Sequence, residues 1–264
     1  MAELDLALGA TLFALGLIGG FTSGLVGLGG GIIMVPLLLY VPPALGVGAL
    51  SMKLVAGITS VQSFFGALSG TFGHKRHRRV SRSLAVTMGG SMALGSLAGS
   101  IASVKLSSEL MLGVFAAMAL VAAVMMLLPK TEDGPELEAE ALVYRRPLAI
   151  VIGGGIGVLS GIIGQGGAFL FIPAMMYLLH IPTRIAIGTG LVIGLASSTA
   201  VLLGRAGTAQ IPVLMSAVLV AGVILGAQLG SAMSQRTPRT ALRSILSVLI
   251  GATAAKIGYE LLLR

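Results

Sequence analysis

The chain contains no cysteine and no tryptophan, and only 10% of its 264 residues are charged. Without cysteine, disulfides and thiolate metal ligands are excluded. Soluble globular chains carry about 25% charged residues. The low value here, with 56% hydrophobic residues and a mean hydropathy of +1.02, indicates an integral membrane protein. The net charge of +8 does not indicate nucleic-acid binding, because the cationic residues fall mostly in short loops between apolar runs, where they report topology.

Acidic and histidine side chains are missing from the middle of every apolar run. A buried proton relay, a carboxylate or imidazole metal site, and a nucleophile paired with a base all require such side chains. We therefore expect a protein that is not an enzyme, with no catalytic residues, no metal site and no cofactor. A carboxylate-based proton antiporter is not expected either.

Glycine is abundant, with 39 residues, and one glycine-rich segment occurs twice. Residues 23–36 read SGLVGLGGGIIMVP, and residues 160–173 read SGIIGQGGAFLFIP. Glycine destabilises helices and accepts positive φ angles, so each copy predicts an interruption between two helical segments. A duplicated interruption in apolar surroundings is typical of transporters built from two repeats.

Ten apolar segments are expected, at about residues 6–26, 31–41, 45–72, 83–104, 108–128, 147–163, 168–180, 185–204, 212–233 and 241–262. The second and seventh are too short to cross a hydrocarbon core of about 30 Å. Because each follows a glycine break, each is expected to form the returning arm of a broken hairpin.

The predicted fold is an all-α polytopic membrane protein with two inverted repeats of about five helical segments each. The first repeat covers residues 1–128 and the second covers residues 147–264, with a cytoplasmic acidic linker at 129–146 between them. The glycine-broken helices are expected to meet near the midplane. If each short segment instead continues its predecessor, eight spans in two parallel halves (4+4) result.

The orientation follows from the cations. Placing the basic loop at residues 75–82 in the cytoplasm satisfies the positive-inside rule. The cytoplasmic side then carries Lys75, Arg76, Arg78, Arg79, Arg82, Lys130, Arg145, Arg146, Arg184, Arg236, Arg239 and Arg243. The outer side carries Lys105, Arg205 and Arg264, and both termini lie outside.

The chemistry expected at the breaks is anion binding by neutral dipoles. A helix that restarts after a break directs backbone N–H groups and its positive dipole end at a common pocket, which suits a compact oxyanion. The alternative is that the glycines only permit close helix packing. Nearby polar side chains either line the site or form structural hydrogen bonds, and Lys53, about eight residues into its segment, either attracts the anion or extends to the membrane surface. The candidate substrate-binding residues are Gly27, Gly29, Gly30, Gly31, Gly164, Gln165, Gly166, Gly167, Ser23, Ser160, Lys53, Gln62, Thr189 and Ser197.

The two glycine motifs and the following Ala186-Ile187-Gly188-Thr189 resemble the TauE/SafE sulfite exporter family, also called TSUP, over nearly the whole chain. The first-half counterpart, Gly46-Val47-Gly48-Ala49, departs from the family's A-x-G-T-S pattern. The resemblance implies export of sulfite, sulfoacetate or related organosulfonates by a multi-pass protein of the bacterial plasma membrane.

The leading interpretation is an exporter of small sulfur-containing anions that works by alternating access. An anion channel of the same architecture and a non-transporting membrane accessory protein are the alternatives. Uncoupled export is favoured, because a potential of about 100 mV, negative inside, favours exit of a monovalent anion by about 2.3 kcal/mol; sodium coupling through backbone carbonyls stays open. The expected partners are a small sulfur-containing oxyanion or organosulfonate and the lipid bilayer, with a homodimer left open and no nucleic acid.

Overall fold

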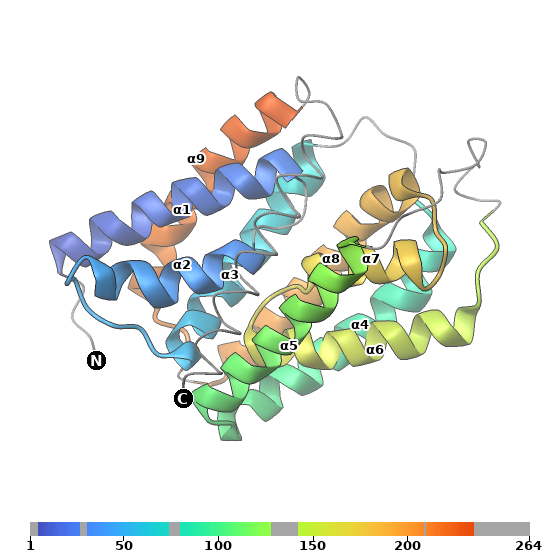
Figure 1. Cartoon of the computed structure of the whole chain (residues 1–264), viewed down its shortest axis with the longest axis horizontal. Coiled ribbons are helices and arrows are strands. Elements are labelled where there is room, and N and C mark those ends of the chain that lie inside the picture. Colours follow the sequence, from blue (N-terminus) through green and yellow to red (C-terminus); the bar gives the residue numbers. More distant parts are fainter. Residues whose placement is uncertain (1–4, 27–30, 74–79, 128–141, 209, 235–264) are drawn as a thin grey trace.

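The computed structural model describes residues 5–26, 31–73, 80–127, 142–208 and 210–234, and these ranges form helices joined by turns and short connections (Figure 1). The α-helices are α1 (Leu6–Val26), α2 (Gly31–Ala44), α3 (Met52–Gly73), α4 (Arg82–Ala102), α5 (Ser108–Leu127), α6 (Arg146–Ile163), α7 (Ala168–Tyr177), α8 (Thr183–Ala206) and α9 (Val213–Ser234). A short 3₁₀ helix, η1 (Ser103–Lys105), follows α4. The tenth predicted segment, at residues 241–262, lies outside the described residues.

Six of the described helices are long and apolar enough to cross a membrane, and α2 and α7 are shorter apolar helices. The outer surface of the bundle carries large apolar side chains that a soluble protein would bury. Leu6, Val86 and Leu94 are 89%, 74% and 72% exposed. Such a surface fits a lipid environment. The protein is thus a polytopic all-α membrane protein, as its composition predicted.

The third predicted segment starts too early. Residues 45–51 are not helical beyond a turn, and Gly46 and Gly48 adopt left-handed φ angles of 70° and 122°. Glycine adopts such angles without steric cost, so the connection can turn before α3 begins at Met52. Lys53 therefore lies in the first turn of α3, rather than eight residues into a span, and its Nζ donates a hydrogen bond of 3.4 Å to the Val104 carbonyl oxygen.

Two helix pairs approach so closely that their backbones touch: α1 with α9, and α4 with α6 (Figure 1). A methyl group built on any of the interface glycines would overlap a backbone atom of the opposite helix or, at Gly153, a serine side chain, so only glycine fits. These glycines are Gly16, Gly20, Gly24, Gly222 and Gly226 in the first pair and Gly95, Gly99, Gly153, Gly157 and Gly161 in the second.

Each of these pairs combines one helix from the first predicted repeat with one helix from the second. The 137-residue offset between the glycine motifs matches α1 with α6, and the order of elements then matches α3 with α8 and α4 with α9. Each close pair thus joins the first helix of one repeat to the fourth helix of the other. The boundaries of the repeats at 1–128 and 147–264 stay a prediction.

Successive contacts give the helix directions. Within each close pair, residues later in one helix contact residues later in the other, so the two helices are parallel. In the α1–α9 pair, Gly16 faces Leu219 and Gly24 faces Ala227. In the α4–α6 pair, Gly157 faces Met92 and Gly161 faces Ser96. α4 and α8 are also parallel, because Gly89 faces Ile193 and Ser96 bonds Ser197 further along both helices.

The remaining directions follow from the start of α3. Lys53 lies beside Val104, just after the end of α4, so α3 runs opposite to α4 and α8. Gly57 contacts Pro212, just before α9, so α3 and α9 start at the same end of the bundle. Helices α1, α3 and α9 therefore run one way, and α4, α6 and α8 run the other. The repeats are inverted for every matched pair described, and the alternative of two parallel halves is excluded.

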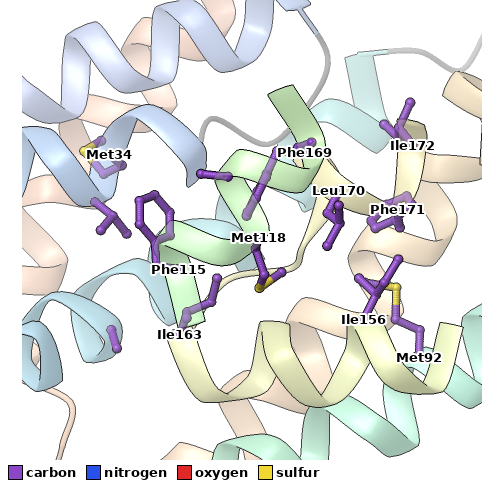
Figure 2. Packing of buried hydrophobic residues seen from close by; sticks show 14 of the residues in the cluster. Met34, Met92, Phe115, Met118, Ile156, Ile163, Phe169, Leu170, Phe171 and Ile172 are labelled. Atoms are coloured by element: carbon purple, nitrogen blue, oxygen red, sulfur yellow. The ribbon is translucent and has the colours of Figure 1, made fainter. Parts of the chain in front are cut away.

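The short helix α7 is surrounded by protein. All seven residues from Phe169 to Met175 are buried, as expected of a helix that is apolar on every side. Phe115 and Met118 of α5 and Phe169 of α7 belong to one buried cluster (Figure 2), and the rings of Phe115 and Phe169 lie 6.1 Å apart in a tilted arrangement. This packing fixes the start of α7, where the second glycine motif ends.

The glycine contact between α4 and α6 can be tested with a pair of alanine substitutions. Gly157→Ala forces a methyl group into the Met92 carbonyl, whereas Gly155→Ala, on an open face of α6, meets nothing within 4 Å. Overpacking costs about 1–3 kcal/mol, so we expect Gly157→Ala to lower the unfolding temperature in detergent. Gly155→Ala should leave it unchanged or raise it slightly, because alanine favours the helix more than glycine does. Equal effects of the two variants would contradict this packing.

The orientation can be tested directly, because the chain has no cysteine. We expect Lys105→Cys to react with a membrane-impermeant maleimide in intact cells. Val143→Cys, which is exposed beside the start of α6 at the opposite end of the bundle, should react only after the membrane is opened. The reverse labelling pattern would overturn the assignment of the cytoplasmic side by the positive-inside rule.

Candidate functional site

The candidate site lies where α6 stops and α7 begins. Gly164 follows α6 with a left-handed φ of 77°, its N–H bonds the Gly161 carbonyl, and the Gln165 N–H bonds the Ser160 carbonyl at 3.0 Å. This is the Schellman arrangement, in which a left-handed glycine satisfies the last carbonyls of a helix. The glycine pattern thus encodes a true helix stop at this point.

The chain restarts as a helix three residues later. Gly167 is also left-handed, with a φ of 67°, and it provides no side-chain cap for α7. Within the described part of the chain, the backbone N–H groups of Gly167, Ala168 and Phe169 donate to no recorded acceptor. Such N–H groups at a helix start carry the positive end of the helix dipole and favour an anion.

Ser160 places a hydroxyl group at the same point. A methyl group on Gly167 would overlap the Ser160 Oγ, so this oxygen lies directly against the start of α7. Ser160 is fully buried, and its Oγ has no hydrogen-bond partner among the described atoms. A buried hydroxyl without a partner is costly, so a ligand that accepted its hydrogen bond would remove this cost.

The break is enclosed by α3, α4 and α8. Gly164 packs against the Ala56 carbonyl of α3, and Gly167 lies beside Met92 of α4. A methyl group placed on Gly166 would lie 3.4 Å from the Gly194 carbonyl oxygen and 3.5 Å from the Ser198 Cβ of α8, which is ordinary van der Waals contact. Non-helical backbone at membrane depth is tolerated where it is buried in protein, and this break meets that condition.

The contacts of the break differ along its length. Gly164 lies beside Ala56, one turn into α3, whereas Gly166 lies beside Gly194 and Ser198 of α8, and Gly167 lies beside Met92, in the middle of α4. The expected location of the breaks near the midplane stays a prediction. The predicted meeting with the first break involves Gly27, Gly29 and Gly30, which lie outside the described residues.

The other predicted site residues are spread over several helices. Gly31 begins α2 and Ser23 is buried in α1. Gln165 is buried at the break itself. Gln62 is 1% exposed in α3, and its Oε1 has no hydrogen-bond partner among the described atoms. Lys53 lies at the bundle end, as described above.

Two of the predicted hydroxyls form structural bonds between helices. Thr189 of α8 accepts a 3.0 Å hydrogen bond from the Ser81 N–H at the start of α4. Ser197 of α8 bonds Ser96 of α4 at 2.7 Å. Both bonds are buried and hold α8 against α4. Their role in binding an anion stays a prediction.

Arg205 is a site residue that the sequence reading missed, since it was assigned to an outer loop. It lies at the end of α8 and is fully buried. Its Nη2 donates to the Gly161 and Ile162 carbonyls at 3.1 and 2.8 Å, and its Nη1 donates to Gln210 Oε1 at 2.8 Å. The guanidinium thus caps the last carbonyls of α6 at the break. An arginine one residue beyond a long apolar run was the available signal.

The electrostatic character of the site is positive. Among the described residues the acids are Asp5 and Glu109, both exposed, and the charged group that is buried is Arg205. The described residues hold no cluster of three or more metal-ligating side chains. Helix-start N–H groups, one hydroxyl and one guanidinium form a donor-rich environment that can hold a small oxyanion.

Comparison with known proteins shows similarity to membrane transporters. A model of the sulfite exporter TauE/SafE family matches residues 12–257. Two relatives from Bacillus subtilis (strain 168) are named "Probable membrane transporter protein" YunE and YdhB: they are 26% and 25% identical over 94% and 89% of this chain, and over 97% and 92% of their own lengths. A "Probable membrane transporter protein" of Xylella fastidiosa (strain 9a5c) is 30% identical over 65% of this chain and 64% of its own. No solved structure matches.

The structural role of Thr189 can be measured. Thr189→Val removes the acceptor of the buried Ser81 N–H, and an unsatisfied buried donor costs about 1–3 kcal/mol. We expect the unfolding temperature in detergent to fall. Thr199→Val is the matched control, because its Oγ1 only donates to a carbonyl of its own helix and its loss should change little. A stable Thr189→Val protein would show that this bond is dispensable.

Proposed function

Because the chain belongs to the sulfite exporter TauE/SafE family, we propose that this membrane transporter exports small sulfur-containing anions, such as sulfite or organosulfonates, across the bacterial plasma membrane. The observation that carries the proposal is the break between α6 and α7. There, open backbone N–H groups and the unpartnered Ser160 hydroxyl converge in an enclosed position. Donors of this kind favour an oxyanion over a cation or a neutral solute.

The absence of buried acid among the described residues supports the sign of the substrate. A cation site would need carboxylates, which are missing from this part of the chain. The donors at the break are backbone N–H groups, the Ser160 hydroxyl and the Arg205 guanidinium, and all of them favour a negatively charged ligand.

The close packing at the break supports a carrier more than an open channel. Gly164 and Gly167 touch neighbouring atoms so closely that no methyl group fits, so an anion reaches this position only after a movement. The pairs α1–α9 and α4–α6 are held together by their glycine faces and are expected to move as units. In alternating access, the α1–α9 pair would then move relative to the α4–α6 pair, and the two halves of the sequence would not move as separate units.

Ser160→Ala separates binding from folding. The substitution removes a hydroxyl that has no partner in the protein, so we expect unchanged or slightly raised stability. If the hydroxyl binds the anion, its loss removes a hydrogen bond to a charged group worth about 1.5–3 kcal/mol, so the half-saturating anion concentration should rise about tenfold or more. Counterflow of radiolabelled sulfite in proteoliposomes measures this change.

Ser91→Ala is the matched control, because the Ser91 hydroxyl donates to a carbonyl of its own helix at 3.0 Å. It should behave as the unmodified protein. Saturable counterflow supports a carrier, while non-saturating flux or single-channel currents would support the channel. Unchanged affinity in folded Ser160→Ala protein would remove Ser160 from the site, and the absence of any anion flux would contradict the proposed function itself.

A further inference from the structure

The structural role of the buried Arg205 guanidinium does not require its positive charge. Three of its hydrogen bonds join the end of α6 to Gln210, in the connection between α8 and α9. A neutral donor could make such bonds to carbonyl oxygens. The guanidinium carries five N–H donors, and its buried Nε has no partner among the described atoms. The positive charge of the guanidinium and its Nε–H donor are therefore not needed for this structural role.

No described acid compensates this charge. Asp5 and Glu109 are exposed, and the groups that Arg205 contacts are two carbonyl oxygens and one amide oxygen. The carbonyl end of α6 supplies only part of a negative charge, about half an elementary charge for a whole helix. A buried cation with so little compensation is expensive, and a bound anion would reduce that cost.

Arg205 lies at the same tip as the other donors. It binds the carbonyls of Gly161 and Ile162, the residues directly after Ser160. The Ser160 Oγ in turn lies against Gly167, at the start of α7. The guanidinium, the hydroxyl and the open N–H groups of α7 thus surround one short hairpin tip, residues 160–169.

We propose that Arg205 supplies the positive charge of the anion site, so that the site selects oxyanions carrying a single negative charge. This inference rests on the proposed function and narrows its substrate class. One buried cation is neutralised by one negative charge. A second negative charge would be left uncompensated in a low-dielectric position, at a cost that grows steeply with burial. Alkyl sulfonates and hydrogen sulfite therefore fit the site, whereas sulfate, the fully ionised form of sulfite and sulfoacetate do not.

Methanesulfonate and sulfate form the test pair, because they have nearly the same tetrahedral size and differ by one charge. We expect the protein in proteoliposomes, held at zero membrane potential, to have a half-saturating concentration at least about tenfold lower for methanesulfonate than for sulfate, since the second charge of sulfate would be buried without compensation. Counterflow of each radiolabelled anion measures both values. Equal values, or a preference for sulfate, would overturn the inference while leaving anion transport in place.

Variants then assign the preference to Arg205. Arg205→Gln keeps hydrogen-bonding groups but removes the charge, so it should raise the half-saturating concentration of methanesulfonate and reduce the preference over sulfate to less than about threefold. Arg205→Lys keeps the charge and should retain the preference with weaker binding, because lysine lacks the planar donor geometry. Lys105→Gln, which removes an exposed cation at the same end of the bundle, should leave the preference unchanged.

The outcomes separate this inference from the proposed function. If Arg205→Gln protein folds and keeps the full preference, Arg205 has only its structural role and the inference fails. If Arg205→Gln does not fold, the preference for methanesulfonate over sulfate is compared in the unmodified protein and in Arg205→Lys. Loss of the preference in folded Arg205→Lys protein, which keeps the charge, would show that the charge of residue 205 does not cause it. If neither anion is transported by the unmodified protein and sulfite is not transported either, the proposed function itself is wrong.

Discussion

An interrupted helix inside a bilayer leaves backbone N–H and C=O groups that lipid cannot satisfy, and the architecture around the α6–α7 break answers this constraint. Three carbonyls at the end of α6 have partners: the Gly164 and Gln165 N–H groups bond those of Gly161 and Ser160, and Arg205 binds those of Gly161 and Ile162. The amide side is left open at the start of α7. Bonded acceptors beside open donors favour a negative charge at the break, and the proposed function rests on this asymmetry.

The same need for protein around the break accounts for the exchange of helices. α7 and the break require neighbours on all sides, and these come from α3, α4, α5 and α8. The glycine faces let α4 approach α6 closely enough to enclose the tip, and the inverted copy of this arrangement joins α1 to α9. Glycine therefore has two separate roles here, to stop helices at the motif and to let helix backbones touch beside it.

Charge placement links this architecture to transport. The described cations Arg82, Arg145 and Arg146 lie at the starts of α4 and α6, the end of the bundle that the positive-inside rule predicts to be cytoplasmic, and the described acids are exposed. Arg205 is the exception, because it is buried at the hairpin tip instead of facing water. Under the proposed function, this charge and the open N–H groups would stabilise an anion at the tip, and the tight contacts of Gly164 and Gly167 would require the tip to move before the anion enters or leaves.

The sequence by itself determined the membrane class, the number of α-helices among the described residues, the opposite directions of the matched helices and the position of the second helix stop. These features depend on composition, apolar run length, charge asymmetry and the φ freedom of glycine, all of which are local. Only the tertiary structure decided that Thr189 and Ser197 bond α4, that Arg205 turns inward, and that α4 packs against α6. Those outcomes depend on which helix faces which, and at what register, and a hydroxyl or a guanidinium carries no local signal of the partner that packing will bring to it.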